Sequence, residues 1–162
     1  MTIGVSDCYR VSVNQLPNLL PPHLAALAVL AMIALHAFFP IAAVVTTPFS
    51  LVGLVPLAAG CAVVVWTRGA FKTARTPIRP LTTSTELVTY GLYRYSRNPM
   101  YVGAVLILSG VATLLGTVGS MLVVPAFALV LQFKFIRREE RLLITTFGEP
   151  YRAYRASVRR WV

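Results

Sequence analysis

Residues 98–133 read NPMYVGAVLILSGVATLLGTVGSMLVVPAFALVLQF and contain no Asp, Glu, Lys or Arg. As a single helix these 36 residues would extend about 54 Å, whereas the hydrocarbon core of a bilayer is about 30 Å thick. The block must therefore fold back on itself. The segment 116–119 (GTVG) near its middle predicts the turn. This gives a hairpin of two helices, residues 99–115 and 118–136, with the second helix running on into the basic tail.

Small residues on both helices predict close packing within this hairpin, because they let two backbones approach each other. They are Gly103, Gly110 and Ala112 on the first helix and Ala126 and Ala128 on the second.

A second uncharged block, residues 11–67, predicts two further spans. They are expected at residues 24–45 and 51–66, on either side of an uncharged turn, and Pro40 should kink or end the first helix. The whole chain is 57% hydrophobic and only 12% charged, against about 25% charged in a typical soluble domain. The predicted fold class is therefore all-α, a polytopic membrane protein with four transmembrane helices.

The charge distribution predicts the orientation. The formal net charge of +10 divides into +5 within residues 68–97 and +5 from Lys134 onward. Positively charged flanks of apolar spans lie on the cytoplasmic side, so both termini are expected there and both uncharged turns outside. This origin of the charge also argues against nucleic acid as a partner, because no basic recognition helix is present. We expect one integral-membrane domain, residues 1–162, with two N-terminal spans in residues 1–67 and a motif-bearing region in residues 68–162.

The two cysteines predict neither a metal site nor a disulfide. Cys8 and Cys61 are isolated, with no C-x-x-C motif and no His at ligand spacing. We expect a terminal thiol and a buried thiol within a span.

The tail from Pro150 onward has the pattern of a short amphipathic helix. Tyr151, Tyr154, Val158 and Trp161 recur at helical spacing, with arginines on another face. Such a helix would lie at the cytoplasmic membrane interface. Tyr151 and Tyr154 could instead reach into a cofactor site, and the two interpretations are compatible.

Polar motifs lie at the ends of the apolar hairpin, where such residues are costly unless they serve a purpose. Residues 91–103 read GLYRYSRNPMYVG before it, and Glu139-Glu140 and then residues 147–154 (FGEPYRAY) follow it. In this order and spacing the motifs resemble the isoprenylcysteine carboxyl methyltransferase and phospholipid methyltransferase superfamily of integral-membrane enzymes. The resemblance runs from about residue 87 to the C-terminus.

The resemblance implies an enzyme that transfers a methyl group from S-adenosylmethionine. By position in the family pattern, the implied cofactor-binding residues are Tyr93, Arg97, Asn98, Pro99, Tyr101, Gly103, Glu139, Glu140 and Tyr151. Arg97 and Glu140 are the predicted catalytic residues. Asn98 departs from the histidine typical of the eukaryotic enzymes, which excludes proton transfer at this position but not hydrogen bonding.

The residue chemistry fits this cofactor. Arg97 can bind a carboxylate with two hydrogen bonds, and the Glu139–Glu140 pair offers an anionic partner. Tyr93, Tyr95 and Tyr101 offer aromatic faces for the sulfonium or the purine. Because neighbours on a helix point about 100° apart, one Glu should face the cofactor while the other faces outward or orients a basic group.

Each feature also has a simpler interpretation. Arg97 could reach to phosphate headgroups, and the two glutamates beside Arg137, Arg138 and Arg141 could form a solvated charged surface. Two other functions remain open. One is a nicotinamide-dependent membrane reductase of the sterol-reductase type, although Ala104 stands where that motif expects an acidic residue. The other is a non-enzymatic four-helix membrane module.

The expected acceptor is a lipid or another amphiphile, because the sequence shows no second cluster of intramembrane charges that could bind a polar substrate. It would enter laterally between helices, with its carboxylate, amine or thiol head near Tyr101 and Arg97.

Overall fold

The computed structural model describes residues 20–40, 42–73 and 87–162. Within these ranges the chain is helical and forms no β-strand, in agreement with the predicted all-α class. The expectations for residues 1–19, Cys8 among them, and for residues 74–86 lie outside the described residues.

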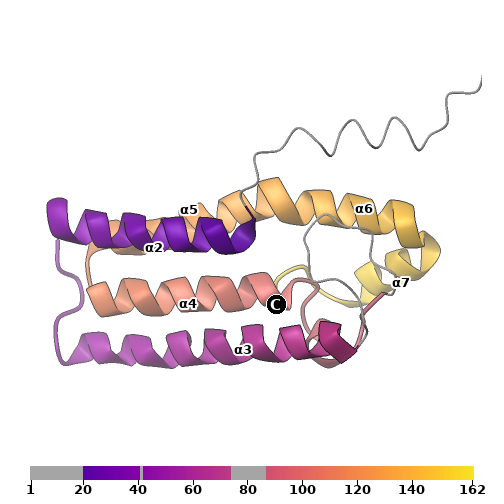
Figure 1. Ribbon diagram of the computed structural model, residues 1–162, viewed down its shortest axis with the longest axis horizontal. Coiled ribbons are helices and arrows are strands. Elements are labelled where there is room, and N and C mark those ends of the chain that lie inside the picture. Colours follow the sequence, from indigo (N-terminus) through magenta and orange to yellow (C-terminus); the bar gives the residue numbers. More distant parts are fainter. Residues whose placement is uncertain (1–19, 41, 74–86) are drawn as a thin grey trace, which may run out of the picture.

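In the described ranges four long helices form a bundle, and short helical turns precede two of them (Figure 1). In chain order the elements are α2 (Pro21–Phe38), the 3₁₀ turn η1 (Phe49–Gly53), α3 (Leu54–Thr73), the 3₁₀ turn η2 (Gly91–Arg94), α4 (Pro99–Leu115), α5 (Val118–Val130), the π-helical segment η3 (Leu131–Ile136), α6 (Arg137–Phe147) and α7 (Glu149–Ser157).

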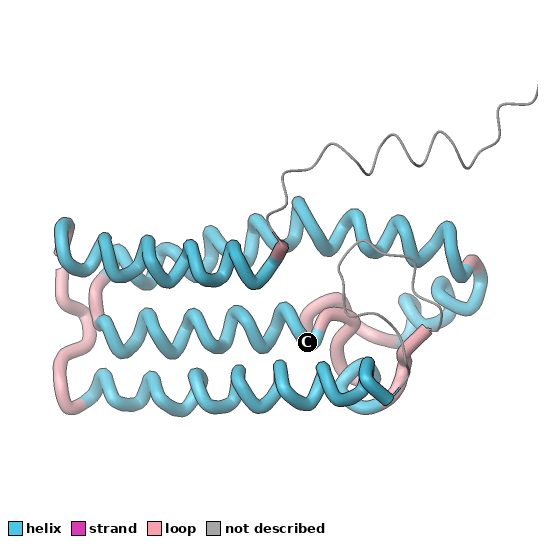
Figure 2. Tube along the Cα trace, in the orientation of Figure 1, coloured by secondary structure: helices cyan, strands magenta, loops and turns pink. Residues whose placement is uncertain are grey.

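The connections α2–α3 and α4–α5 meet at one end of the bundle, where Figure 2 shows both as loops. Ala43 pairs with Thr117 in an isolated antiparallel bridge, and the amide of Val44 donates to the carbonyl of Gly116 at 2.7 Å. Both connections are uncharged. The charged residues at the start of α4 and in α6 and α7 lie toward the opposite end, so the two ends of the bundle differ in polarity.

The first two spans differ from their predicted bounds. Helix α2 ends at Phe38, short of the expected end of the span at residue 45. It stops just before Pro40, as predicted for this proline, because the residue before a proline is disfavoured in helical conformation. Helix α3 continues to Thr73, beyond the predicted end at residue 66. Cys61 on this helix is exposed, not buried as we expected.

Three helical stretches among the described residues are long and apolar enough to cross a membrane: Pro21–Phe38, Phe49–Gly69 and Val118–Phe147. Helix α4 is equally apolar but has 17 residues. Length and composition therefore support three of the four predicted spans, and a membrane crossing by α4 stays a prediction.

The two helices α4 and α5 are joined by two residues. Gly116 adopts a left-handed conformation with φ of 67°, and Thr117 is extended. Helix α5 begins at Val118, the predicted start of the second helix of the hairpin. A carbonyl of the first connection lies against the Gly116 Cα where a side chain would be, so the turn requires glycine for both space and backbone conformation.

The two glycines of α4 pack against α3 and not, as predicted, against α5. Gly103 lies against Gly60 of α3, and Gly110 lies against Gly53, the last residue of η1 directly before that helix. On the other helix of the predicted hairpin contact, Ala126 is exposed. The two contacts are seven residues apart along each chain segment, which is about two helical turns. The antiparallel helices therefore meet backbone to backbone at two levels. This contact holds α4, and with it the entrance residue Arg97, close to α3.

We predict that Gly60→Ala destabilises the protein. A Cβ at this position would lie 2.6 Å from the carbonyl oxygen of Gly103, so the helices must separate, at a cost of about 1–3 kcal/mol. The thermal unfolding midpoint in detergent, followed by tryptophan fluorescence, should fall by several degrees.

Gly69→Ala on the same helix is the matched control. A Cβ there has no atom within 4 Å, and alanine is favoured over glycine within a helix by about 1 kcal/mol. Its midpoint should equal or exceed that of the wild type. Equal midpoints for Gly60→Ala and the wild type would contradict the close α3–α4 contact.

Candidate functional site

The start of α4 places Arg97 at the polar end of the bundle. Pro99 is the first residue of the helix and Asn98 precedes it, a position that suits proline because the first helical N–H has no intrahelical acceptor. The amide of Asn98 donates to the Ser96 side chain at 3.1 Å. Arg97 thus leaves a short, tied loop and points into the protein, with its side chain only 10% exposed.

The π-helical segment η3 sets the direction of the two glutamates. From Val118 to Phe147 the chain is continuously helical, about 45 Å long, so its C-terminal part extends past a bilayer core. Leu131 and Glu140 are nine residues apart and would lie on opposite sides of a regular α-helix, at about 100° per residue. The wider π turn acts like a one-residue insertion, which reduces the angle between Leu131 and Glu140 around the helix axis. Both side chains therefore lie on the buried side of the helix.

Glu140 is shared between two arginines. Its Oε1 lies 2.9 Å from Nη1 of Arg97. Arg160, near the C-terminus, donates to both carboxylate oxygens, from Nε to Oε1 at 2.8 Å and from Nη2 to Oε2 at 2.7 Å. The glutamate side chain is 8% exposed and that of Arg160 is 29% exposed. The cluster Arg97–Glu140–Arg160 therefore carries a net charge of +1 in a largely buried position.

Arg97 is incompletely satisfied in this cluster. Among the described residues, neither its Nε nor its Nη1 has an acceptor at hydrogen-bonding geometry, although Nη1 is in ion-pair distance of Glu140. A buried guanidinium with free donors and a net positive neighbourhood favours an additional anion.

Glu139 lies beside the cluster with a different partner. Its Oε1 accepts a hydrogen bond of 2.8 Å from the Tyr101 hydroxyl, and within the described chain it forms no salt bridge. Both glutamates thus face the protein. Glu140 pairs with two basic groups, and neither glutamate faces outward, which was one of the alternatives predicted for the second Glu.

Aromatic residues enclose the same region. Tyr151 of α7 is 1% exposed, and burial raises the pKa of its hydroxyl above the ordinary value, with Glu140 acting in the same direction and Arg97 in the opposite one. Tyr93 is also largely shielded, and burial followed by the charge of Glu139 raises the pKa of its hydroxyl. Both phenols therefore stay protonated at neutral pH and can donate hydrogen bonds. Tyr95, which we grouped with them, is 73% exposed and points away.

The tail differs from the predicted amphipathic helix. Helix α7 ends at Ser157, and Val158 is extended, so Val158 and Trp161 do not continue its helical face. The face that holds Tyr151 and Tyr154 packs on the protein: Tyr151 is buried, and the hydroxyl of Tyr154 donates to the carbonyl of Tyr93 at 2.7 Å. The helix ends because the following residues pair with the segment before α4.

This pairing brings in residues that the sequence did not reveal. Ser96 and Arg159 form a parallel bridge, and the Asn98 side chain donates to the carbonyl of Arg160 at 3.0 Å. The indole of Trp161 donates to the Gln132 side chain at 3.0 Å. No spacing rule relates positions so far apart, and the arginines of the tail read alike in sequence, so Arg160 could not be singled out.

The structure thus brings most of the predicted site residues together. Around one end of the bundle lie Tyr93, Arg97, Tyr101, Glu139, Glu140 and Tyr151. Asn98 and Pro99 shape the entrance of α4. Gly103 lies against α3 and allows helix packing at that point.

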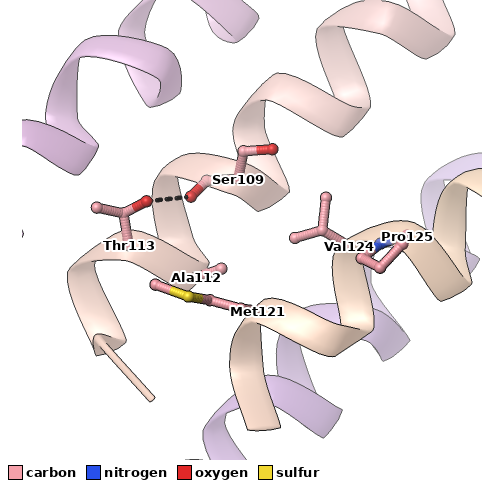
Figure 3. Close-up of a pocket in the computed structure, with 6 residues that line it drawn as sticks. All are labelled: Ser109, Ala112, Thr113, Met121, Val124 and Pro125. Atoms are coloured by element: carbon pink, nitrogen blue, oxygen red, sulfur yellow. Dashed lines mark hydrogen bonds between the residues drawn. The ribbon is translucent and has the colours of Figure 1, made fainter. Parts of the chain in front are cut away.

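A separate groove opens between α4 and α5, nearer to the Gly116 turn (Figure 3). Its lining is mostly apolar: Ser109, Ala112, Thr113, Met121, Val124 and Pro125. The two hydroxyl groups do not change this character, because each donates to a carbonyl of its own helix, Ser109 at 2.8 Å and Thr113 at 2.9 Å.

The fold and the site define an integral-membrane helical protein with a buried polar site at one end of the bundle. Residues 49–150, more than half of the chain, match the phospholipid methyltransferase family. The chain belongs to this family. A similar protein is the protein-S-isoprenylcysteine O-methyltransferase of Schizosaccharomyces pombe, 43% identical over 75 residues, which cover 44% of this chain but 30% of that relative's length. Family membership favours a methyltransferase over the reductase and the non-enzymatic module.

Proposed function

We propose that this protein transfers a methyl group from S-adenosylmethionine to an amphiphilic acceptor at the cytoplasmic face of the membrane. The observation that carries the proposal is the buried cluster of net charge +1, in which Arg97 keeps free donors. Glu139 lies next to it without a cationic partner among the described residues. A site with one available cation and one available anion suits the amino-acid end of this cofactor, which has a carboxylate and an ammonium group.

The residues fit the cofactor in distinct roles. Arg97 would bind the carboxylate, and Glu139, positioned by Tyr101, would bind the ammonium group. Glu140 keeps Arg97 in place and is itself occupied by Arg160. Tyr93 and Tyr151 offer protonated hydroxyls and aromatic surface for the rest of the molecule. This assigns the two glutamates different tasks.

When bound, S-adenosylmethionine would supply an electrophilic methyl group attached to its sulfonium sulfur. After transfer of the methyl group, this sulfur is left as a neutral thioether. The protein's contribution is alignment and exclusion of water. Burial of Tyr151 and of the Arg97–Glu140 pair shields the site from solvent. The carboxylates Glu139 and Glu140 offset positive charge nearby. With a thiolate or carboxylate as acceptor, the reaction needs no dedicated base.

We predict that the detergent-purified protein binds S-adenosylhomocysteine, the demethylated product, and that Arg97→Ala and Glu140→Ala each weaken binding. Truncating one partner of a buried charge pair between protein and ligand costs about 2–5 kcal/mol, so Arg97→Ala should raise Kd by roughly thirtyfold or more. Glu139→Gln should weaken it through loss of the ammonium contact. Isothermal titration calorimetry measures all three.

The matched control for these variants is Glu149→Gln. Glu149 pairs with Arg152 on the exposed surface of α7, where an ion pair contributes about 0–1 kcal/mol. This variant should bind like the wild type. Wild-type affinity in both Arg97→Ala and Glu139→Gln would contradict the cofactor-binding roles proposed for these two residues.

The acceptor is proposed to be a lipid or prenyl-like amphiphile that enters between helices. Its head would lie near Tyr101 and Arg97. The groove between α4 and α5 supports this, because Ser109 is eight residues along α4 from Tyr101, about 12 Å. A hydrocarbon chain reaches that distance easily. Family membership points to a related acceptor class.

We predict that tritiated methyl groups pass from the donor into the organic phase when the enzyme is incubated with membrane extract. An amphiphilic acceptor partitions there because each buried methylene contributes about 0.8 kcal/mol of transfer free energy. An Arg97→Ala enzyme is the control for counts that do not depend on the site. Counts found solely in water-soluble products would reject the lipid acceptor and leave a small-molecule methyltransferase.

The site is proposed to face the cytoplasm, with both termini on that side and four membrane crossings. The support is the +5 charge carried by each of the segments 68–97 and 134–162 in the sequence. In addition, both uncharged connections meet at the end of the bundle opposite the charged start of α4 (Figure 1).

We predict that a cysteine at Thr46 reacts with a membrane-impermeant maleimide in intact cells, in a Cys8→Ser, Cys61→Ser background. Thr46 is exposed in the first connection, whereas Thr117 in the second is buried and unsuitable for labelling. A cysteine at the exposed Ala156 should react only after permeabilisation. The opposite pattern would reverse the orientation.

A further inference from the structure

The C-terminal segment, residues 158–161, lies alongside the residues that lead into α4. The amide of Arg97 donates to the carbonyl of Arg159 at 2.9 Å, and the Asn98 side chain donates to that of Arg160 at 3.0 Å. Trp161 is tied to Gln132 in the π-helical segment. These main-chain and side-chain contacts hold the backbone of Arg160 beside the entrance of α4, with its side chain directed at Glu140.

The geometry of the charged cluster is unequal. Arg160 takes both oxygens of Glu140 in a forked arrangement, at 2.8 and 2.7 Å. Arg97 contacts one oxygen, through Nη1 at 2.9 Å and without hydrogen-bonding angles. An arginine and a carboxylate buried alone would normally form the forked pair with each other. Here the forked site on Glu140 belongs to the more exposed of the two arginines.

We infer that Arg160 is a positioning residue: it occupies Glu140 and so leaves the guanidinium of Arg97 available for the carboxylate of the ligand. The inference rests on the proposed function and adds a residue to it. Without Arg160 the cluster would be neutral, and Arg97 would turn fully onto Glu140. With Arg160 the cluster holds one positive charge in excess, which a ligand carboxylate neutralises.

The test compares two ligands that differ in one group, S-adenosylhomocysteine and its decarboxylated analogue, which has a hydrogen in place of the carboxylate. Calorimetry on the full-length protein gives both dissociation constants and their ratio. The wild type should prefer S-adenosylhomocysteine. In Arg160→Ala this preference should fall by roughly tenfold or more, the equivalent of a charge-assisted hydrogen bond, whereas the affinity for the analogue should change by less than about threefold.

Two further variants complete the test. Arg159→Ala removes the neighbouring exposed side chain but keeps its carbonyl, and it should retain the wild-type preference. Arg160→Lys keeps the charge but not the fork, so it should retain part of the preference and remains informative if the alanine variant does not fold.

The outcomes separate the two proposals. An equal loss of affinity for both ligands in the Arg160 variants would make Arg160 a merely structural residue and overturn the inference. Unchanged preference in them would overturn it as well. A wild-type protein that binds neither ligand would overturn the proposed function, and the inference with it.

Discussion

The buried carboxylate of Glu140 is the point on which the functional end of the molecule depends. Arg97 reaches it from the entrance of α4 and Arg160 from the C-terminus, so one side chain joins three segments that are distant in sequence. Charges in such a position must be paired, because their desolvation is costly. The cluster is a structural tie, and its excess of one positive charge suits it to the anion-binding role proposed for it.

Two features of the helices make this arrangement possible. The glycine pairs Gly53–Gly110 and Gly60–Gly103 set α4 against α3 at backbone distance, which fixes where Arg97 enters. The π-helical segment η3 turns the continuation of α5 so that Glu140 faces inward. The packed helices fix the position of Arg97, and the π turn sets the direction of the Glu140 side chain. Such π turns often occur where a helix carries function.

Polar and apolar requirements are separated along α4. Its first turn carries Tyr101, which hydrogen-bonds Glu139 at the charged end of the bundle. Its last turns line an apolar groove with α5. An amphiphile has the same division between head and chain. Helix α4 therefore offers a charged environment for the head of the proposed acceptor at one end and an apolar environment for its chain at the other.

Part of the site was evident in the sequence. Arg97, Tyr101 and the Glu139–Glu140 pair stand at the ends of an uncharged block whose length forces a return, so they had to meet at one end. The partners of individual side chains were not evident. Two neighbouring glutamates look equivalent in sequence, yet one binds arginines and the other a tyrosine, and Tyr95 points away although it lies between residues that converge.

What the sequence by itself determined was the class of protein and the order of its parts. Long uncharged blocks belong in a membrane, and a 36-residue block cannot cross it once, so the bounds 99–115 and the helix start at residue 118 followed from length and turn residues. The tertiary structure decided which faces meet. Gly103 packs on α3 and the tail after Ser157 is extended, because pairing with Ser96 and Asn98 outweighs the local helical pattern. Arg160 owes its place to those contacts alone: periodicity relates neighbours along a helix, but it carries no information about segments some 60 residues apart.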